Sequence, residues 1–203
     1  MPVRRASAKT AWCFTAIIKV RLWQGRNVWL QSGKSEEQDY IFICVKNYSL
    51  EDVCESIRDM VTEDTVIIPV MNGVDPGENI RRLVGKGTVV DSLIYTVAFS
   101  NADFSVSQQD TFTWLCIGIK DADERQQEKV AEVAEILKGA DIDYKDQGDI
   151  EVEIWRKYIL NCAFNVMTAF YDNTIGELRS DPVKAQQYET LVWEAARDRK
   201  SVV

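Results

Sequence analysis

The chain has 203 residues, of which 46% are hydrophobic, and a formal net charge of −8. This length and composition are typical of a globular protein with one large domain or two small ones. An acidic chain lacks the clustered Lys and Arg that bind phosphate backbones, so we expect no nucleic-acid partner. No apolar run reaches the roughly 18 residues that a membrane span needs, so we expect no membrane association.

Basic residues are concentrated at the start of the chain. Residues 1–34 contain seven basic residues and no acidic residue. Such a start can be an organelle transit peptide, although residues 12–20 have the pattern of a folded strand. A displaced start codon, a frameshift or a basic edge of the domain would give the same distribution, and the sequence leaves these alternatives open.

The chain has five cysteines and no histidine. The cysteines are widely spaced, form no C-x-x-C pair and mostly lie among apolar residues. They are typical of small core residues in a reducing compartment, so we expect a cytoplasmic protein. Without histidine we expect no zinc site, no His-based triad and no bound metal. A proton donor has to be Lys, Asp, Glu, Tyr or Cys.

An α/β pattern begins at residue 39. Residues 39–46 (DYIFICVK) and 65–70 (TVIIPV) are apolar runs typical of strands covered on both faces. Between them, Ser49 can cap a helix that runs to about Met60, with Asp52 completing an approximate capping box. Strand, helix and strand with short connections predict a βαβ unit.

The following residues extend this pattern. Residues 87–120 contain β-rich segments around a polar loop, which we expect to continue the sheet. Residues 122–138 carry apolar side chains at helical spacing and predict an amphipathic helix. We therefore expect a partial Rossmann-like parallel-sheet domain over residues 1–147.

The pattern is helical from Gly148 onward. Residues 149–171 predict one long helix that is apolar nearly all round, and such a helix is buried. Asp181-Pro182 is a typical helix start and predicts another helix toward Arg197. We expect an all-α domain over residues 148–203, and hence an α/β fold followed by a helical domain.

One side of the helix at residues 149–171 is polar. Lys157, Asn161, Asn165 and Thr168 follow one another at helical spacing and lie along one stripe. The stripe is either a solvent face or the lining of a site. Solvent faces usually consist of better helix formers than Asn. Asn can hold hydroxyl and carboxylate groups, and a partly desolvated Lys can act as a general acid near neutral pH.

Lys46 and Asn72 lie where the two predicted strands end, at the edge where open α/β sheets bind ligands. Taken singly, Lys46 is typical of an exposed lysine, and Asn72-Gly73 of a common turn. Their recurrence at the ends of neighbouring strands makes a cofactor site there more plausible than either residue alone would.

Three segments resemble those of the ketopantoate reductases: VKNYSLEDV at 45–53, IIPVMNGVDPGE at 67–78 and, most specifically, EIWRKYILNCAFNVMTAFYDNTIGEL at 153–178. They occur in the family's order at similar spacing, and the resemblance runs from about Asp39 to Ala195. It implies reduction of a 2-keto acid with NADPH, namely of 2-dehydropantoate to pantoate in the pantothenate pathway.

The resemblance also implies roles for residues of the polar stripe. Lys157 would be the general acid that protonates the keto oxygen as hydride reaches the carbonyl carbon. Asn161 and Asn165 would bind the hydroxyl and carboxylate ends of the substrate.

On the cofactor side, the resemblance implies that Lys46 and Asn72 contact NADPH and that Asn72 also contacts the substrate. Ala98 would make a backbone contact near the nicotinamide. A homodimer is a further expectation, because helical domains of this kind often pair.

The chain also departs from the family pattern. Residues 1–38 lack the G-x-G-x-x-G motif that holds the cofactor's pyrophosphate, because Gly25 and Gly33 are too far apart. Ile175 replaces a later asparagine, and the sequence stops at Val203, before further site residues of the family. We therefore expect a chain truncated at both ends. It is either an oxidoreductase or an inactive remnant that acts as a folded or dimerising module.

Overall fold

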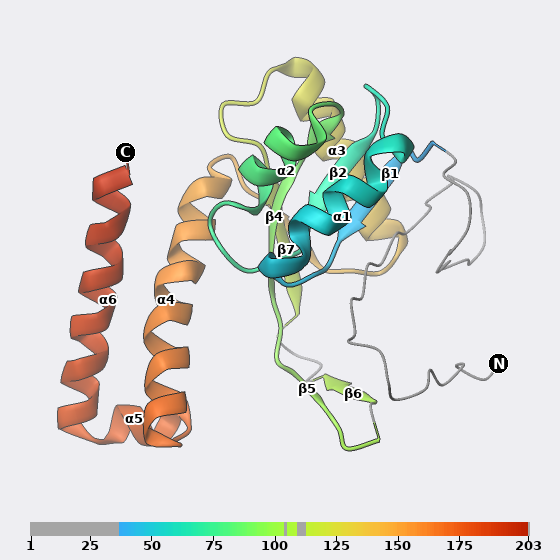
Figure 1. Ribbon diagram of the computed structural model, residues 1–203. Helices are drawn as coiled ribbons and strands as arrows, with labels where there is room; N and C mark the ends of the chain where they lie inside the picture. Colours follow the sequence, from blue (N-terminus) through green and yellow to red (C-terminus); the bar gives the residue numbers. More distant parts are fainter. Residues whose placement is uncertain (1–36, 104, 109–112, 203) are drawn as a thin grey trace.

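The computed structural model describes residues 37–103, 105–108 and 113–202 (Figure 1). An α/β part is followed by a group of helices at its side. The basic segment at residues 1–34, including the strand predicted at 12–20, lies outside the described residues. In the part of the chain that is described, no helix is long and apolar enough to cross a bilayer.

A parallel three-stranded sheet forms the centre of the α/β part. β1 (Tyr40–Ile43) pairs with β2 (Val66–Pro69), which pairs with β3 (Thr88–Val89). All residues of β1 and β2 are buried, as is typical of parallel strands covered on both faces. α1 (Leu50–Ile57) connects β1 to β2, so the predicted βαβ unit is confirmed.

α1 begins directly after Ser49, the predicted N-cap, but the expected capping box with Asp52 is wrong. The Ser49 side chain makes no capping hydrogen bond, because its backbone has ψ near 0° instead of the extended conformation of a typical N-cap. A 3₁₀ turn, Asn47–Ser49, leads into the helix, and the Ser49 amide donates to the Lys46 carbonyl (2.9 Å). A second 3₁₀ turn, Arg58–Met60, follows the helix.

α2 (Pro76–Val84), which connects β2 to β3, is not expected from the sequence. It has proline in its first turn and is followed by Gly85, whose φ of 76° lies in the left-handed region that favours glycine. Both residues are normal helix ends, but the nearby Asn72-Gly73 turn gives the segment the composition of a loop.

The chain continues into a second three-stranded sheet. β4 (Asp91–Tyr95) is antiparallel to β7 (Trp114–Gly118), and β7 is parallel to β8 (Tyr144–Asp146). Val90, which joins β3 to β4, donates a hydrogen bond to the Ile67 carbonyl (2.9 Å). The two sheets therefore follow directly from each other.

The prediction that residues 87–120 continue the parallel sheet holds only for β3. β4 and β7 are antiparallel, and β5 (Ala98–Ser100) and β6 (Val106–Gln108) form a hairpin of their own. Between β4 and β7 the chain returns through this hairpin. A parallel neighbour would need a longer crossover connection, usually a helix.

α3 (Glu124–Gly139) confirms the amphipathic helix predicted at 122–138. Its N-terminus has a complete capping box: the Asp123 Oδ1 accepts from the Gln126 amide (2.8 Å), and the Gln126 Oε1 accepts from the Asp123 amide (3.0 Å). α1 and α2 cover the opposite face of the parallel sheet. The core beneath α3 consists of Tyr40, Phe42, Val66, Ile68, Val90, Leu115, Ile117, Ile119, Val130, Val133 and Leu137.

Three helices complete the described chain: α4 (Ile150–Tyr171), α5 (Ile175–Ser180) and α6 (Pro182–Val202). α4 and α6 lie side by side and are joined at one end by α5 (Figure 1). The helix predicted at 149–171 is confirmed. Asp181 begins α6 as expected, and its Oδ1 accepts a hydrogen bond from the Val183 amide (2.9 Å).

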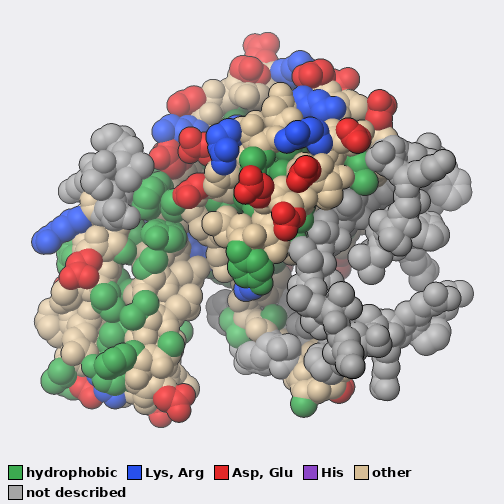
Figure 2. Space-filling view, viewed as in Figure 1, with side chains coloured by type: hydrophobic (Ala, Val, Ile, Leu, Met, Phe, Trp, Pro, Cys, Tyr) green, Lys and Arg blue, Asp and Glu red, His purple; other side chains and the backbone are tan. Residues whose placement is uncertain are grey.

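α4 is not buried on all sides, contrary to the expectation from its composition. Trp155 and Met167 are buried, but Val166 and Phe170 are 55% and 78% exposed. The sheet covers one side of α4 and α6 covers another, so a third side faces no other part of the described chain. Figure 2 shows hydrophobic side chains gathered along α4 and α6, while charged side chains dominate the visible face of the α/β part.

Candidate functional site

Lys157 extends from α4 toward the α/β part. Its Nζ donates hydrogen bonds to the Oδ1 of Asn72 (2.9 Å) and to the carbonyl of Ile94 (2.5 Å). Asn72 follows β2, and Ile94 lies in β4. One ammonium group therefore links the polar stripe of α4 to the edge where the parallel strands end, and it does not point to bulk water.

The start of α4 is fixed by the second sheet. The Gln147 amide, just after β8, donates to the Ile117 carbonyl of β7 (3.0 Å). A side chain on Gly118 would clash here, because its Cβ would lie 2.5 Å from the Gln147 carbonyl oxygen. Asp149 then caps α4 by accepting from the Val152 amide (3.3 Å). These contacts position the first turns of the helix, and with them Lys157.

The surroundings of Lys157 lower its pKa below the ordinary lysine value. The main cause is burial, which penalises the charged form, and a smaller effect of Cys116 acts in the opposite direction. The ring of Tyr95 lies on one side of the ammonium, with its centre 5.7 Å from the Nζ. The structure thus has a partly desolvated lysine, a kind of group that can act as a general acid nearer neutral pH.

The hydrogen bonds of Lys157 leave one donor unassigned. An ammonium carries three N–H groups, and within the described residues two of them have acceptors, on Asn72 and Ile94. The third can donate to a substrate oxygen. After the proton has left, the neutral amine keeps two N–H donors for the same two acceptors.

Asn161 and Asn165 lie one and two turns beyond Lys157 on the same side of α4. Asn161 is half-buried and Asn165 is exposed. Neither side chain hydrogen-bonds to another described residue, so both amides are free to bind a ligand. Thr168, the next residue of the stripe, instead donates to the Phe164 carbonyl of its own helix (2.7 Å).

Among the described residues, no hydrogen bond or ion pair joins Lys46 or Ala98 to the Lys157–Asn72 pair. Both are exposed, Lys46 after β1 and Ala98 at the start of β5. Because β1 and β2 are parallel neighbours, Lys46 and Asn72 lie at the same edge of the sheet. Among the predicted site residues in the described chain, a side-chain hydrogen bond joins only Lys157 and Asn72.

Two groups beside Lys157 are not expected from the sequence: the Ile94 carbonyl and the Tyr95 ring. A backbone acceptor leaves no trace in the residue type. Tyr95 carries a weak signal, because it lies two residues after the buried Leu93 and therefore on the same face of β4, the face that α4 covers.

Residues 7–121 match the family model for ketopantoate reductase PanE/ApbA, and residues 149–197 match the model for its C-terminal part. A 2-dehydropantoate 2-reductase of Archaeoglobus fulgidus is 26% identical over 170 residues, which are 82% of this chain and 51% of the relative. The crystal structure of a 2-dehydropantoate 2-reductase from Porphyromonas gingivalis W83 is 25% identical with a TM-score of 0.68, covering 79% of this chain and 55% of that one.

The ternary structure of D-mandelate dehydrogenase with NADH and anilino(oxo)acetate is also similar, with a TM-score of 0.69, 19% identity and coverage of 81% of this chain and 52% of that one. At this identity the likeness shows the fold alone, a Rossmann-like parallel sheet followed by a helical domain. The chain spans about half the length of the curated relatives it matches. Since the first family model alone matches more than half of the residues, the chain belongs to the ketopantoate reductase family.

Proposed function

We propose that the chain carries the proton-donating side of a 2-keto acid reductase, with NADPH as hydride donor and 2-dehydropantoate as substrate. One observation carries the proposal: the Lys157 ammonium is held by Asn72 and the Ile94 carbonyl at the edge where the parallel strands end. Ligands of open α/β sheets bind at this edge. Membership of the family supports the reaction class.

Lys157 is the proposed general acid. Hydride addition to a ketone places negative charge on its oxygen, and the third N–H of Lys157 is available to donate there. A lowered pKa brings the lysine closer to neutral pH, where proton transfer is most effective, and such transfer contributes about 10²- to 10⁴-fold. Asn72 and the Ile94 carbonyl hold the nitrogen before and after the transfer.

Asn161 and Asn165 are the proposed substrate-binding residues, together with Asn72. Successive turns of α4 place the two amides at intervals of about 5.4 Å beyond Lys157. This spacing suits a small, branched keto acid with a carboxylate at one end and a hydroxyl at the other. Each amide offers both donor and acceptor atoms to these groups.

Lys46, Asn72 and Ala98 are the proposed contacts for the cofactor. Lys46 is exposed and has no ion pair among the described residues, so it can pair with a phosphate. The Nδ2 of Asn72 remains available when its Oδ1 accepts from Lys157, and Ala98 offers exposed backbone at the start of β5. These residues fit a dinucleotide, which supplies the hydride when bound.

Titration with NADPH, followed by nicotinamide fluorescence, tests the proposal on the full chain. Saturable binding in the micromolar range would support it, and no saturation up to millimolar NADPH would overturn it. Lys46→Ala should weaken binding. Lys138→Ala is a matched control, because this lysine of α3 has a side chain that is 69% exposed and lies outside the proposed site.

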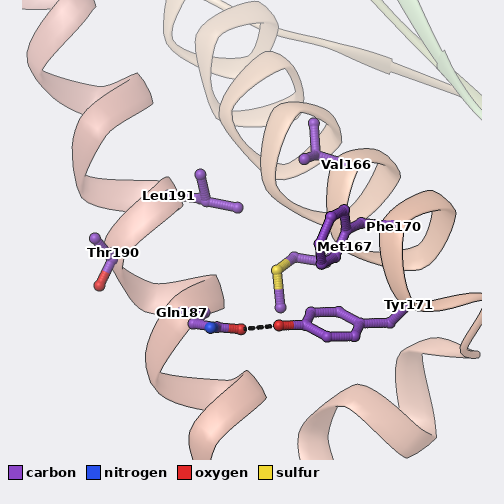
Figure 3. A pocket seen from close by; sticks show the side chains of 7 residues that line it. All are labelled: Val166, Met167, Phe170, Tyr171, Gln187, Thr190 and Leu191. Atoms are coloured by element: carbon purple, nitrogen blue, oxygen red, sulfur yellow. Dashed lines mark hydrogen bonds between the residues drawn. The ribbon is translucent and has the colours of Figure 1, made fainter.

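A second candidate, a dimerising module without catalysis, is supported by an apolar groove between α4 and α6 (Figure 3). The groove has a volume of about 320 Å³, and the hydroxyl of Tyr171 donates across it to the Oε1 of Gln187 (2.6 Å). Its lining residues are Val166, Met167, Phe170, Tyr171, Gln187, Thr190 and Leu191.

The proposed occupant of this groove is a second copy of the chain. α4 and α6 are each about 30 Å long, and two such helix pairs can form a four-helix bundle. Exposed apolar surface of this kind marks an interaction site. Sedimentation should show a dimer that Phe170→Ser converts to a monomer, whereas a monomeric wild-type chain would exclude the candidate.

A further inference from the structure

The side chains of Tyr95, Trp114 and Lys145 form a row on the face of the second sheet that α4 covers. Tyr95 pairs with Trp114 across β4 and β7, and Lys145 of β8 pairs with Cys116 of β7. Because alternate residues of a strand share a face, Trp114 lies on the same face as Cys116. Cys116 belongs to the same buried cluster as Ile150 of α4, against which Tyr95 and Trp114 also pack.

The row ends at Lys157. The Nζ of Lys145 lies 4.8 Å from the Trp114 ring centre, and the Trp114 and Tyr95 rings are 4.9 Å apart with a tilt of 31°. The Nζ of Lys157 is 5.7 Å from the Tyr95 ring centre. The two aromatic rings therefore lie between two ammonium groups, that of Lys145 beside Trp114 and that of Lys157 beside Tyr95. Rings at this distance attract each other, and so do a cation and a ring within about 6 Å.

We propose that Tyr95 is a positioning residue for Lys157 and that Trp114 supports it. This role rests on the proposed function in one respect, namely that Lys157 acts there as the general acid. The Tyr95 ring borders the ammonium without taking up one of its N–H groups, so the third donor stays available. A carboxylate in the same place would accept that N–H and raise the pKa of Lys157.

Trp114 keeps the Tyr95 ring in place from the other side. The two residues are directly paired across antiparallel strands, and just beyond them the hydroxyls of Thr96 and Thr113 hydrogen-bond to each other (3.0 Å). Burial, the main cause of the lowered pKa of Lys157, depends on what surrounds the ammonium, and the Tyr95 ring occupies one side of it.

The experiment follows the Lys157 ammonium itself, by NMR titration of the full chain labelled with ¹³C- and ¹⁵N-lysine, without substrate or cofactor. The Lys157 signal is assigned by its loss in Lys157→Met. We expect Tyr95→Leu to let water reach the ammonium, so that the pKa of Lys157 rises toward the ordinary value. Loss of the ring's attraction acts in the opposite direction, but it is weak at 5.7 Å.

Tyr95→Phe keeps the ring and should leave the titration of Lys157 unchanged. Trp114→Leu should also raise the pKa of Lys157, by a smaller amount. If Tyr95→Leu does not fold, Trp114→Leu takes its place, and an unchanged pKa of Lys157 in that variant would overturn the proposal. The signal of Lys120 is the internal control, because its pKa is raised by Glu151, on another side of α4.

An unchanged Lys157 titration in Tyr95→Leu, or an equal shift in Tyr95→Phe, would overturn the role of Tyr95. The result does not depend on turnover. A chain that binds no NADPH contradicts the proposed function, but the NMR titration of Lys157 can still be carried out on it. Conversely, an NMR result that overturns the role of Tyr95 does not affect the measurement of NADPH binding.

Discussion

The Nζ of Lys157 lies 2.9 Å from the Oδ1 of Asn72, although the two residues are 85 positions apart in the sequence. Lys157 belongs to α4, and Asn72 follows β2 of the parallel sheet. The contact therefore couples the helical part of the molecule to the sheet at the point where the chemistry is proposed. Its consequences for activity and for pH dependence can be measured separately.

The proposed function predicts that replacing Lys157 with Met lowers the reduction of 2-dehydropantoate by about 10²- to 10⁴-fold, because the keto oxygen would lose its proposed proton donor. Lys157→Arg should be equally inactive, since a guanidinium keeps its proton at every accessible pH. The measurement is kcat at saturating NADPH, with circular dichroism to confirm the fold. Turnover within a few-fold of the wild type would contradict the assignment.

The stability of the chain should depend on pH through Lys157. Its pKa is lowered in the folded state, so between that pKa and the ordinary value of about 10.4 the unfolded chain binds more protons. The free energy of unfolding therefore increases as the pH rises through this window. Below the window, the buried charge costs stability.

Lys157→Met lacks this contribution, so the wild type should gain stability relative to the variant as pH rises through the window. Urea unfolding of both proteins at several pH values measures the difference. A difference that stays constant across the window would show that the surroundings of Lys157 do not shift its pKa.

Gly77→Ala is expected to destabilise the fold by about 1–3 kcal/mol. A Cβ at this position would lie 1.7 Å from the Oδ1 of Asp91, whose Oδ2 is held by Arg81 at 2.5 Å. The matched control is Gly139→Ala in α3, where a Cβ would meet no atom within 4 Å. Alanine there should be neutral or stabilising by up to about 1 kcal/mol, and equal losses in both variants would refute the steric explanation.

The N-cap residues of α3 and α1 are expected to contribute differently to stability. Asp123→Ala removes a complete capping box and should lower the free energy of unfolding by about 1 kcal/mol. Ser49→Ala should have little effect, because the Ser49 side chain makes no capping hydrogen bond. Thermal unfolding of the two variants checks this order, and a larger loss for Ser49→Ala would reverse it.

Features that depend on local periodicity can be predicted from the sequence. The buried strands, the two long helices and the polar stripe of α4 follow from the spacing of apolar residues. The meeting of Lys157 with Asn72 could be inferred only from the family resemblance, which assigns both residues to the substrate, whereas the parallel strands account for Lys46 and Asn72 lying at one edge of the sheet.

Features that depend on tertiary neighbours could not be predicted. The Ile94 carbonyl has no signature in the residue type, and the orientation of β4 is decided by the hairpin that follows it. The exposure of Phe170 depends on which sides of α4 have a neighbour, which its apolar composition does not reveal. Tyr95 becomes informative only when its strand is placed beneath α4.

The short connection between β8 and α4 has a consequence for how such chains can diverge. Residues 147–149 join a strand tied to β7 to the first turn of the helix. Each residue of a helix adds about 100° of rotation and 1.5 Å of rise. Because these residues hold the first turn of α4 against the sheet, losing or gaining a residue between Ile150 and Lys157 would rotate Lys157 about 100° around the helix and away from Asn72. Insertions and deletions, which surface loops usually tolerate, should therefore be rare in the first two turns of α4.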